Sequence, residues 1–232
     1  MLEHSSRFEA SRAEIWSQLH AVVILTACAG AAIVGHPWLL LACAVMSFGT
    51  LCLRERGSWT SSGRFGPANA VTALRIVLTC VIGSALGAPG ALLAFAGLVV
   101  FALDAFDGLI ARRTHSESAF GARFDMESDA FLVLVLGLVL YQRGGLGVWI
   151  LSSGLLRYIY VLCLALLPSR REELPRSRFG RMAFAALVVG LLSALLVPGP
   201  ITTGVALFGT ALVCASFARG FVHSFGPRPL VG

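Results

Sequence analysis

Long apolar runs alternate with short polar connections along almost the whole chain. Each run approaches the roughly 20 residues that an α-helix needs to cross the hydrocarbon core of a membrane. The pattern therefore predicts membrane-spanning helices, with the polar residues marking their connections. We expect eight of these helices, at residues 20–35, 38–53, 68–87, 90–112, 121–141, 146–167, 180–197 and 201–218.

The composition agrees with an all-α integral membrane protein and excludes an ordinary soluble domain. Hydrophobic residues make up 57% of the 232 residues and charged residues 13%, and the mean hydropathy is +0.83. The six cysteines lie singly in or beside apolar runs without CxxC spacing, so we interpret them as small apolar residues. The five scattered histidines lack metal-ligand spacing, and we expect them at the surface or at interfaces.

A basic, glycine- and serine-rich segment separates the first two apolar runs from the other six. The first run could be read as a cleaved signal peptide, but it leads directly into a second run, as in a retained helical hairpin. Trp16 precedes this run, where tryptophan commonly marks the membrane interface. We expect a polar segment and two helices at residues 1–53, a linker at 54–66, a catalytic core at 67–222 and a tail at 223–232.

The arginines are distributed unevenly among the connections. The connections at 54–66, 112–123 and 168–181 carry three, three and five arginines, whereas the others carry one or none. By the positive-inside rule these basic connections face the cytoplasm, and with eight spans both termini do so too. The bias toward Arg, Ala, Gly, Leu and Val indicates a bacterial gene, so we expect the protein in the bacterial inner membrane.

Four aspartates lie in or against apolar sequence between residues 104 and 129. Asp104 and Asp107 are three residues apart, and Asp125 and Asp129 are four apart, so each pair projects from one helix face. The polar stretch at 114–120 predicts a turn that brings both pairs to a similar depth. Carboxylates at membrane depth need a compensating charge, and a divalent cation with oxygen ligands supplies it. Pairing with arginines inside the helix bundle is the structural alternative.

The same segment reads DxxDGxxAR, then eight residues, then GxxxDxxxD. This string resembles the signature of the CDP-alcohol phosphatidyltransferases, membrane enzymes with a six-helix core. The resemblance covers about residues 66–220 and leaves two extra helices before it. Every position of the signature is filled, by Asp104, Asp107, Gly108, Ala111, Arg112, Gly121, Asp125 and Asp129.

The resemblance implies two divalent cations, Mg²⁺ or Mn²⁺, at the four aspartates. Asp104 and Asp125 would bridge both cations, Asp107 would complete one and Asp129 the other. The family role of Asp129 also includes taking the proton from the acceptor hydroxyl.

The resemblance further implies a site for the CDP group of the donor. The string PxNxxTxxR, from Pro67 to Arg75, is similar to the family's PNxxTxxR, although Ala68 separates the proline from the asparagine. Arg75 itself is expected to form a salt bridge within the bundle. Helix capping is the alternative role for Asn69, and binding of lipid headgroups is the alternative for Arg112. The implied CDP contacts are Pro67, Asn69, Thr72, Gly108, Ala111, Arg112, Ser118 and Gly121.

The reaction implied is transfer of a phosphatidyl group from CDP-diacylglycerol to a polar alcohol, with release of CMP, in phospholipid biosynthesis. Arg157 lies mid-span and Arg178 lies in the basic connection, and we expect both to contact the acceptor. An arginine-rich pocket favours a phosphorylated acceptor such as glycerol 3-phosphate or inositol phosphate, with serine and choline as alternatives. Family analogy also implies a homodimer among membrane lipids, with no nucleic-acid partner.

Two other classes of protein would also place carboxylates in apolar helices. A cation-coupled transporter would do so, but it would not need the DGxxAR string or the spacing from Gly121 to Asp125. A catalytically silent scaffold would be expected to have lost at least one aspartate.

Overall fold

The computed structural model describes the chain apart from residues 1–11, 61, 114–117, 168–176 and 227–232, and apart from the side chains at 12, 13, 105 and 107–113. The described part is helical and contains no strand, which confirms the predicted fold class. Its helices are α1 (Arg12–Val34), α2 (Trp38–Arg54), α3 (Pro67–Ser84), α4 (Gly90–Arg113), α5 (Ala119–Gln142), η1 (Val148–Ile150), α6 (Leu151–Leu166), α7 (Arg178–Leu196) and α8 (Pro200–Phe225).

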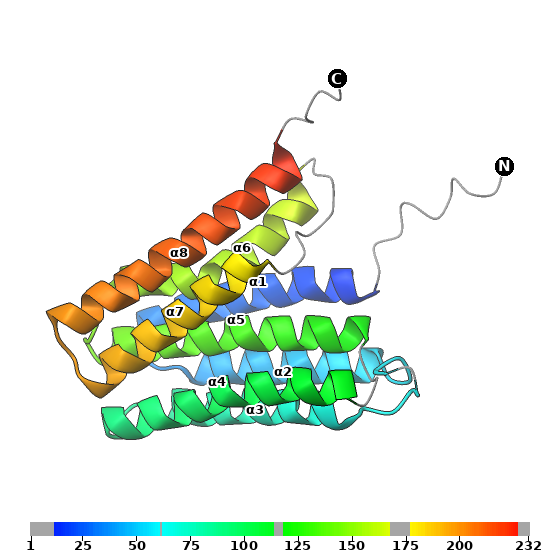
Figure 1. Ribbon diagram of the computed structural model, residues 1–232, viewed down its shortest axis with the longest axis horizontal. Helices are drawn as coiled ribbons and strands as arrows, with labels where there is room; N and C mark the ends of the chain where they lie inside the picture. Colours follow the sequence, from blue (N-terminus) through cyan, green and yellow to red (C-terminus); the bar gives the residue numbers. More distant parts are fainter. Residues whose placement is uncertain (1–11, 61, 114–117, 168–176, 227–232) are drawn as a thin grey trace.

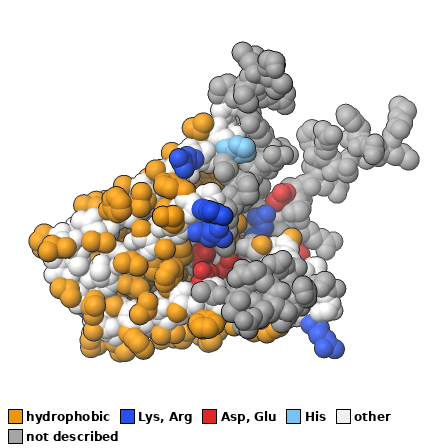
Figure 2. Space-filling view, in the orientation of Figure 1, with side chains coloured by type: hydrophobic (Ala, Val, Ile, Leu, Met, Phe, Trp, Pro, Cys, Tyr) orange, Lys and Arg blue, Asp and Glu red, His pale blue; other side chains and the backbone are white. Residues whose placement is uncertain are grey.

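Several helices are suited to a membrane by their length and composition. Within the described residues, five stretches are long and apolar enough to cross a bilayer, and α2 and the first part of α4 are shorter apolar helices. Figure 2 shows hydrophobic side chains over most of the visible face, with charged side chains gathered toward one end. The five long stretches are Glu14–Val34, Pro67–Ser84, Val148–Leu166, Arg178–Leu196 and Pro200–Phe225.

Local chemistry explains where the helices begin. Proline occupies the first turn of both α3 and α8, where its missing N–H costs no hydrogen bond. Ser118 and Ser177 cap α5 and α7, each accepting a hydrogen bond of 2.9 Å from the amide of the glycine three residues later. The predicted helix positions hold to within a few residues for most of the chain.

The largest difference from the sequence-based boundaries is at α1, which begins at Arg12 and not near residue 20. The Trp16 side chain is only 3% exposed, so it packs inside the bundle; its depth at the membrane interface stays a prediction. Its indole N–H donates to the Ser47 carbonyl at 2.9 Å, which joins α1 to α2. The polar start of α1 is thus packed against protein.

Helix α5 occupies the centre of the bundle. It packs against α3, α6 and α7, and also contacts α1 and α4 (Figure 1). Each residue from Phe131 to Leu140 is buried, so this half of α5 is covered on all sides. The helix ends that flank the three basic connections lie toward the same end of the bundle (Figure 1), as the arginine distribution predicts. The side of the membrane that this end faces stays a prediction.

Helices α7 and α8 approach each other closely through glycines. A Cβ atom at Gly209 would lie 2.5 Å from the Cα of Leu187, and one at Gly190 would lie 2.7 Å from the Cα of Ala206. Real Cβ atoms do not come so close to backbone, so a side chain at either position would push the two helices apart.

We predict that Gly209→Ala destabilises the protein by about 1–3 kcal/mol, because overpacking forces the backbones of α7 and α8 apart. Thermal unfolding in detergent measures this change. Gly204→Ala is the matched control, since Gly204 lies on the same helix with open space around its Cβ position. Equal melting temperatures for the two variants would contradict the packing argument.

Candidate functional site

A buried arginine lies at the centre of the aspartate cluster. Arg75 of α3 is fully buried, and its Nη1 lies 3.0 Å from Asp104 Oδ1 and 2.7 Å from Asp125 Oδ1. Its Nη2 donates to Asp129 Oδ1. The predicted salt bridge of Arg75 within the bundle is therefore confirmed, and one guanidinium joins α3 to both α4 and α5.

The carboxylates themselves converge as the spacing predicted. One carboxylate oxygen from each of Asp104, Asp125 and Asp129 lies within 4.8 Å of the other two. The side chains are 30%, 18% and 15% exposed, in that order. Asp107 follows Asp104 by about one turn of α4, but its side chain lies outside the described residues, as do those of Gly108, Ala111 and Arg112.

The described donor set fits a divalent cation. Three carboxylates from two helices offer hard oxygen ligands, which Mg²⁺ and Mn²⁺ prefer. Three negative charges against the one positive charge of Arg75 leave a net charge of −2 among these four residues. Asp104, Asp125 and Asp129 could therefore hold a metal. The structural alternative, in which the aspartates pair with an arginine, is also present, because Arg75 contacts all three. This pairing does not exclude a metal.

Two of the residues predicted to bind CDP, Asn69 and Ser118, meet at the linker before α3. Asn69 Nδ2 donates to the carbonyls of Trp59 at 3.2 Å and Phe65 at 2.5 Å. Ser118 Oγ donates to the same Trp59 carbonyl at 2.7 Å while it caps α5. The capping alternative for Asn69 is wrong, because the N-cap residue of α3 is Gly66. These bonds fasten the linker to the starts of α3 and α5.

Gly121 and Thr72 belong to the same region. A Cβ atom at Gly121 would lie 3.0 Å from Asn69 Oδ1, so glycine permits this approach of α5 to α3. Thr72 is 3% exposed and donates to the Ala68 carbonyl at 3.2 Å. Asn69, Thr72 and Arg75 succeed one another every three residues along the buried face of α3. This face leads from the linker, past Pro67 at the start of the helix, to the aspartates.

A second buried ion pair lies on the opposite face of α5. Glu127 is two residues from both Asp125 and Asp129, a rotation of roughly 200° on a helix. Its side chain is 1% exposed, and its Oε1 accepts a hydrogen bond of 2.8 Å from Arg157 Nη2 of α6. Glu127 was not among the residues predicted for the site, although a carboxylate inside apolar sequence implies a buried partner.

Polar side chains of α1 and α2 lie in the same part of the bundle. His20 is 1% exposed, and its Nδ1 lies 2.7 Å from Ser47 Oγ of α2. Arg123 of α5 donates to Ser17 Oγ of α1 at 2.8 Å. The surface position expected for His20 is wrong, because the rings of Trp16, Phe48 and Tyr158 pack around it. This network attaches the first two helices to the core.

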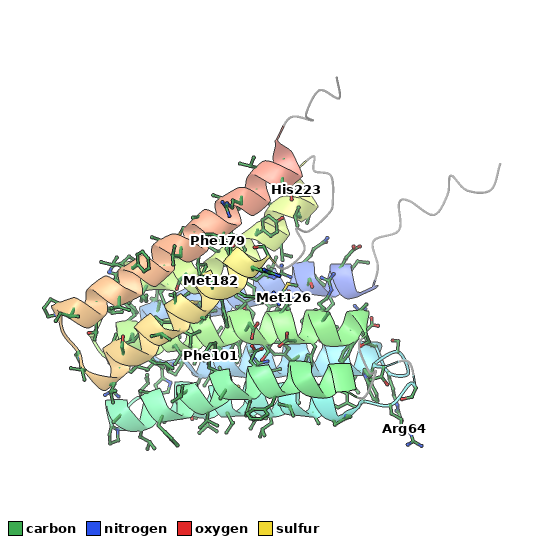
Figure 3. All side chains as sticks on the ribbon, in the orientation of Figure 1. Arg64, Phe101, Met126, Phe179, Met182 and His223 are labelled. Carbon is green, nitrogen blue, oxygen red and sulfur yellow. The ribbon has the colours of Figure 1, made fainter. Side chains whose placement is uncertain are left out.

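The two residues predicted to contact the acceptor differ in environment. Arg157 is 8% exposed and paired with Glu127, whereas Arg178 is the exposed first residue of α7. Helix α7 packs against α4 and α5, and Figure 3 labels Met182, which lies one turn after Arg178 on α7. The helix that begins at Arg178 is therefore a neighbour of the helix that carries Asp125 and Asp129.

Comparison with known protein families gives one match. The family model described as CDP-alcohol phosphatidyltransferase matches residues 65–217, which run from the end of the linker into α8. Helices α1 and α2 lie outside the match. Comparisons with curated proteins and with solved structures gave no match.

We predict that Glu127→Leu alone destabilises the protein by about 3–5 kcal/mol, because it leaves the Arg157 guanidinium buried without its carboxylate. The double variant Glu127→Leu/Arg157→Met removes both charges and is expected to recover most of this loss. Thermal unfolding in detergent measures both variants. Glu55→Leu, a half-buried carboxylate at the end of α2, is the control. If the double variant is no more stable than Glu127→Leu, the ion pair does not account for the loss.

Proposed function

Because the chain belongs to the CDP-alcohol phosphatidyltransferase family, we propose that it transfers a phosphatidyl group from CDP-diacylglycerol to a polar alcohol and releases CMP. The observation that carries this proposal is the convergence of Asp104, Asp125 and Asp129 within 4.8 Å, inside the stretch that matches the family. A cation-coupled transporter could also contain such carboxylates, but it would not need the DGxxAR string or the spacing from Gly121 to Asp125.

The chemistry requires a nucleophile, a leaving group and a place for one proton. The acceptor oxygen forms a bond to the phosphatidyl phosphorus, and the bond from that phosphorus to the CMP oxygen breaks. Asp129 takes the proton of the acceptor hydroxyl, and Arg75 holds its carboxylate in place. Mg²⁺ or Mn²⁺ held by Asp104, Asp107, Asp125 and Asp129 would supply charge neutralisation for the diphosphate and the departing CMP.

The CDP group is proposed to lie where α3, α5 and the linker meet. Asn69, Thr72 and Ser118 carry polar side chains there, and Gly121 lets the side chains of Asn69 and Ser118 lie close to the backbone of α5. Arg112, at the end of α4, would bind phosphate oxygens through its guanidinium. Pro67, at the start of α3, and Gly108 and Ala111, on α4, complete the proposed set of CDP contacts.

The acceptor is proposed to be a phosphorylated alcohol, with glycerol 3-phosphate preferred over inositol phosphate, serine or choline. Arg178 supports this choice because a cation at the N-terminus of a helix is unfavourable for the helix dipole, so helix stability does not explain it. On the face of the molecule that Figure 2 displays, basic side chains lie beside an acidic patch. A homodimer in the bacterial inner membrane, with both termini and the site on the cytoplasmic side, completes the proposal.

The transferase proposal predicts CMP release from CDP-diacylglycerol in the presence of Mg²⁺ or Mn²⁺. Purified protein is assayed with glycerol 3-phosphate, inositol phosphate, inositol, serine and choline, and EDTA should abolish release. Asp129→Asn should lower kcat at least about 100-fold because the proton acceptor is lost. Glu55→Gln, a carboxylate outside the cluster, should retain activity. A folded wild-type protein that releases no CMP and binds no CDP would overturn the assignment.

The acceptor proposal predicts that Arg178→Gln raises KM for the phosphorylated alcohol by about 10- to 100-fold, the loss expected for a hydrogen bond to a charged group. KM for CDP-diacylglycerol should stay unchanged. Arg54→Gln is the control, because Arg54 is an exposed arginine that ends α2 outside the matched stretch. An unchanged acceptor KM would exclude Arg178 from acceptor binding.

A further inference from the structure

Arg75 combines three properties that an ordinary structural salt bridge does not need together. Its side chain is fully buried, it lies in the middle of α3, and its two terminal nitrogens reach three carboxylates. Those carboxylates are the described members of the proposed metal site. Arg75 is therefore a permanent positive charge inside the group of residues that would bind divalent cations.

The carboxylates require such a charge whenever no metal is bound. Their oxygens lie within 4.8 Å of one another on α4 and α5, and like charges at that distance repel one another in a partly buried site, where the effective dielectric constant is below that of water. A guanidinium cannot lose its proton in a protein, and its planar fork presents several N–H groups in a fixed geometry. Arg75 can thus keep Asp104 of α4 beside Asp125 and Asp129 of α5 without a metal.

The same contacts place Arg75 in competition with a metal. Nη1 is 3.0 Å from Asp104 Oδ1 and 2.7 Å from Asp125 Oδ1, so it uses oxygens that a cation would also need. A metal that binds these oxygens must share them with the guanidinium, and the two positive charges repel each other. The arginine therefore keeps the site assembled and at the same time lowers its affinity for metal.

We propose that Arg75 is a built-in counter-cation, a positioning residue that holds the aspartates of α4 and α5 together without metal and weakens divalent-cation binding to them. This inference rests on the proposed function, because it takes the aspartate cluster as the metal site. It adds a role for Arg75 in setting the metal requirement. The chain would stay folded when metal is scarce, and the metal would remain exchangeable.

The test compares Arg75→Met, which removes the charge at similar length, with Arg75→Lys, which keeps the charge. Mn²⁺ binding to purified protein in detergent is titrated by electron paramagnetic resonance of free Mn²⁺, and melting is measured in EDTA. We expect Arg75→Met to bind Mn²⁺ at least about tenfold more tightly than wild type and to melt at a lower temperature in EDTA. Arg75→Lys should retain near wild-type affinity for Mn²⁺.

A further variant keeps the test decisive if Arg75→Met does not fold. Arg75→Met/Asp104→Asn removes one positive and one negative charge together and should restore folding in EDTA. Failure of this double variant to fold, or Mn²⁺ affinity of Arg75→Met at or below that of wild type, would overturn the proposal. Neither readout depends on phosphatidyl transfer, so failure of the transferase assay alone would leave the role of Arg75 standing.

Discussion

The arrangement of this bundle depends on compensating charge at membrane depth. All four aspartates of the chain lie within one segment of 26 residues, from Asp104 to Asp129, and the three that the structure describes surround Arg75. Another carboxylate, Glu127, lies on the opposite face of α5 and pairs with Arg157. Helix α5 therefore needs a cation on two sides, and this requirement fixes α3 against one face and α6 against the other.

The fold class could be predicted from the sequence because membrane helices depend on long apolar runs, and proline and glycine mark their ends. The start of α1 could not be predicted, since Ser17 and His20 have the composition of an aqueous segment. In the structure their partners are Arg123 and Ser47, so protein replaces water around them. Hydropathy cannot distinguish a polar residue in solvent from one buried among distant polar partners.

The sequence could predict only those parts of the candidate site that are formed by one helix, or by two helices joined by a turn. The spacing brought Asp104 toward Asp125 and Asp129, and the resemblance identified Asn69, Ser118 and Gly121. The shared partner of Asn69 and Ser118 is the Trp59 carbonyl, a backbone atom to which no side-chain pattern points. The partners of Arg75 and Glu127 likewise depend on which helices become neighbours, and that is a property of the whole bundle.

The hydrogen bonds between α1 and α2 have a consequence for how the protein is made. Trp16 and His20 both bind Ser47, which is 31 and 27 residues later in the chain, so the first hairpin contains both partners of these two bonds once α2 has been synthesised. Ser17 meets Arg123 only after 106 further residues have been synthesised. The order of translation thus allows α1 and α2 to pair first, with the Trp16 indole N–H already bonded to Ser47, before the later helices assemble on them.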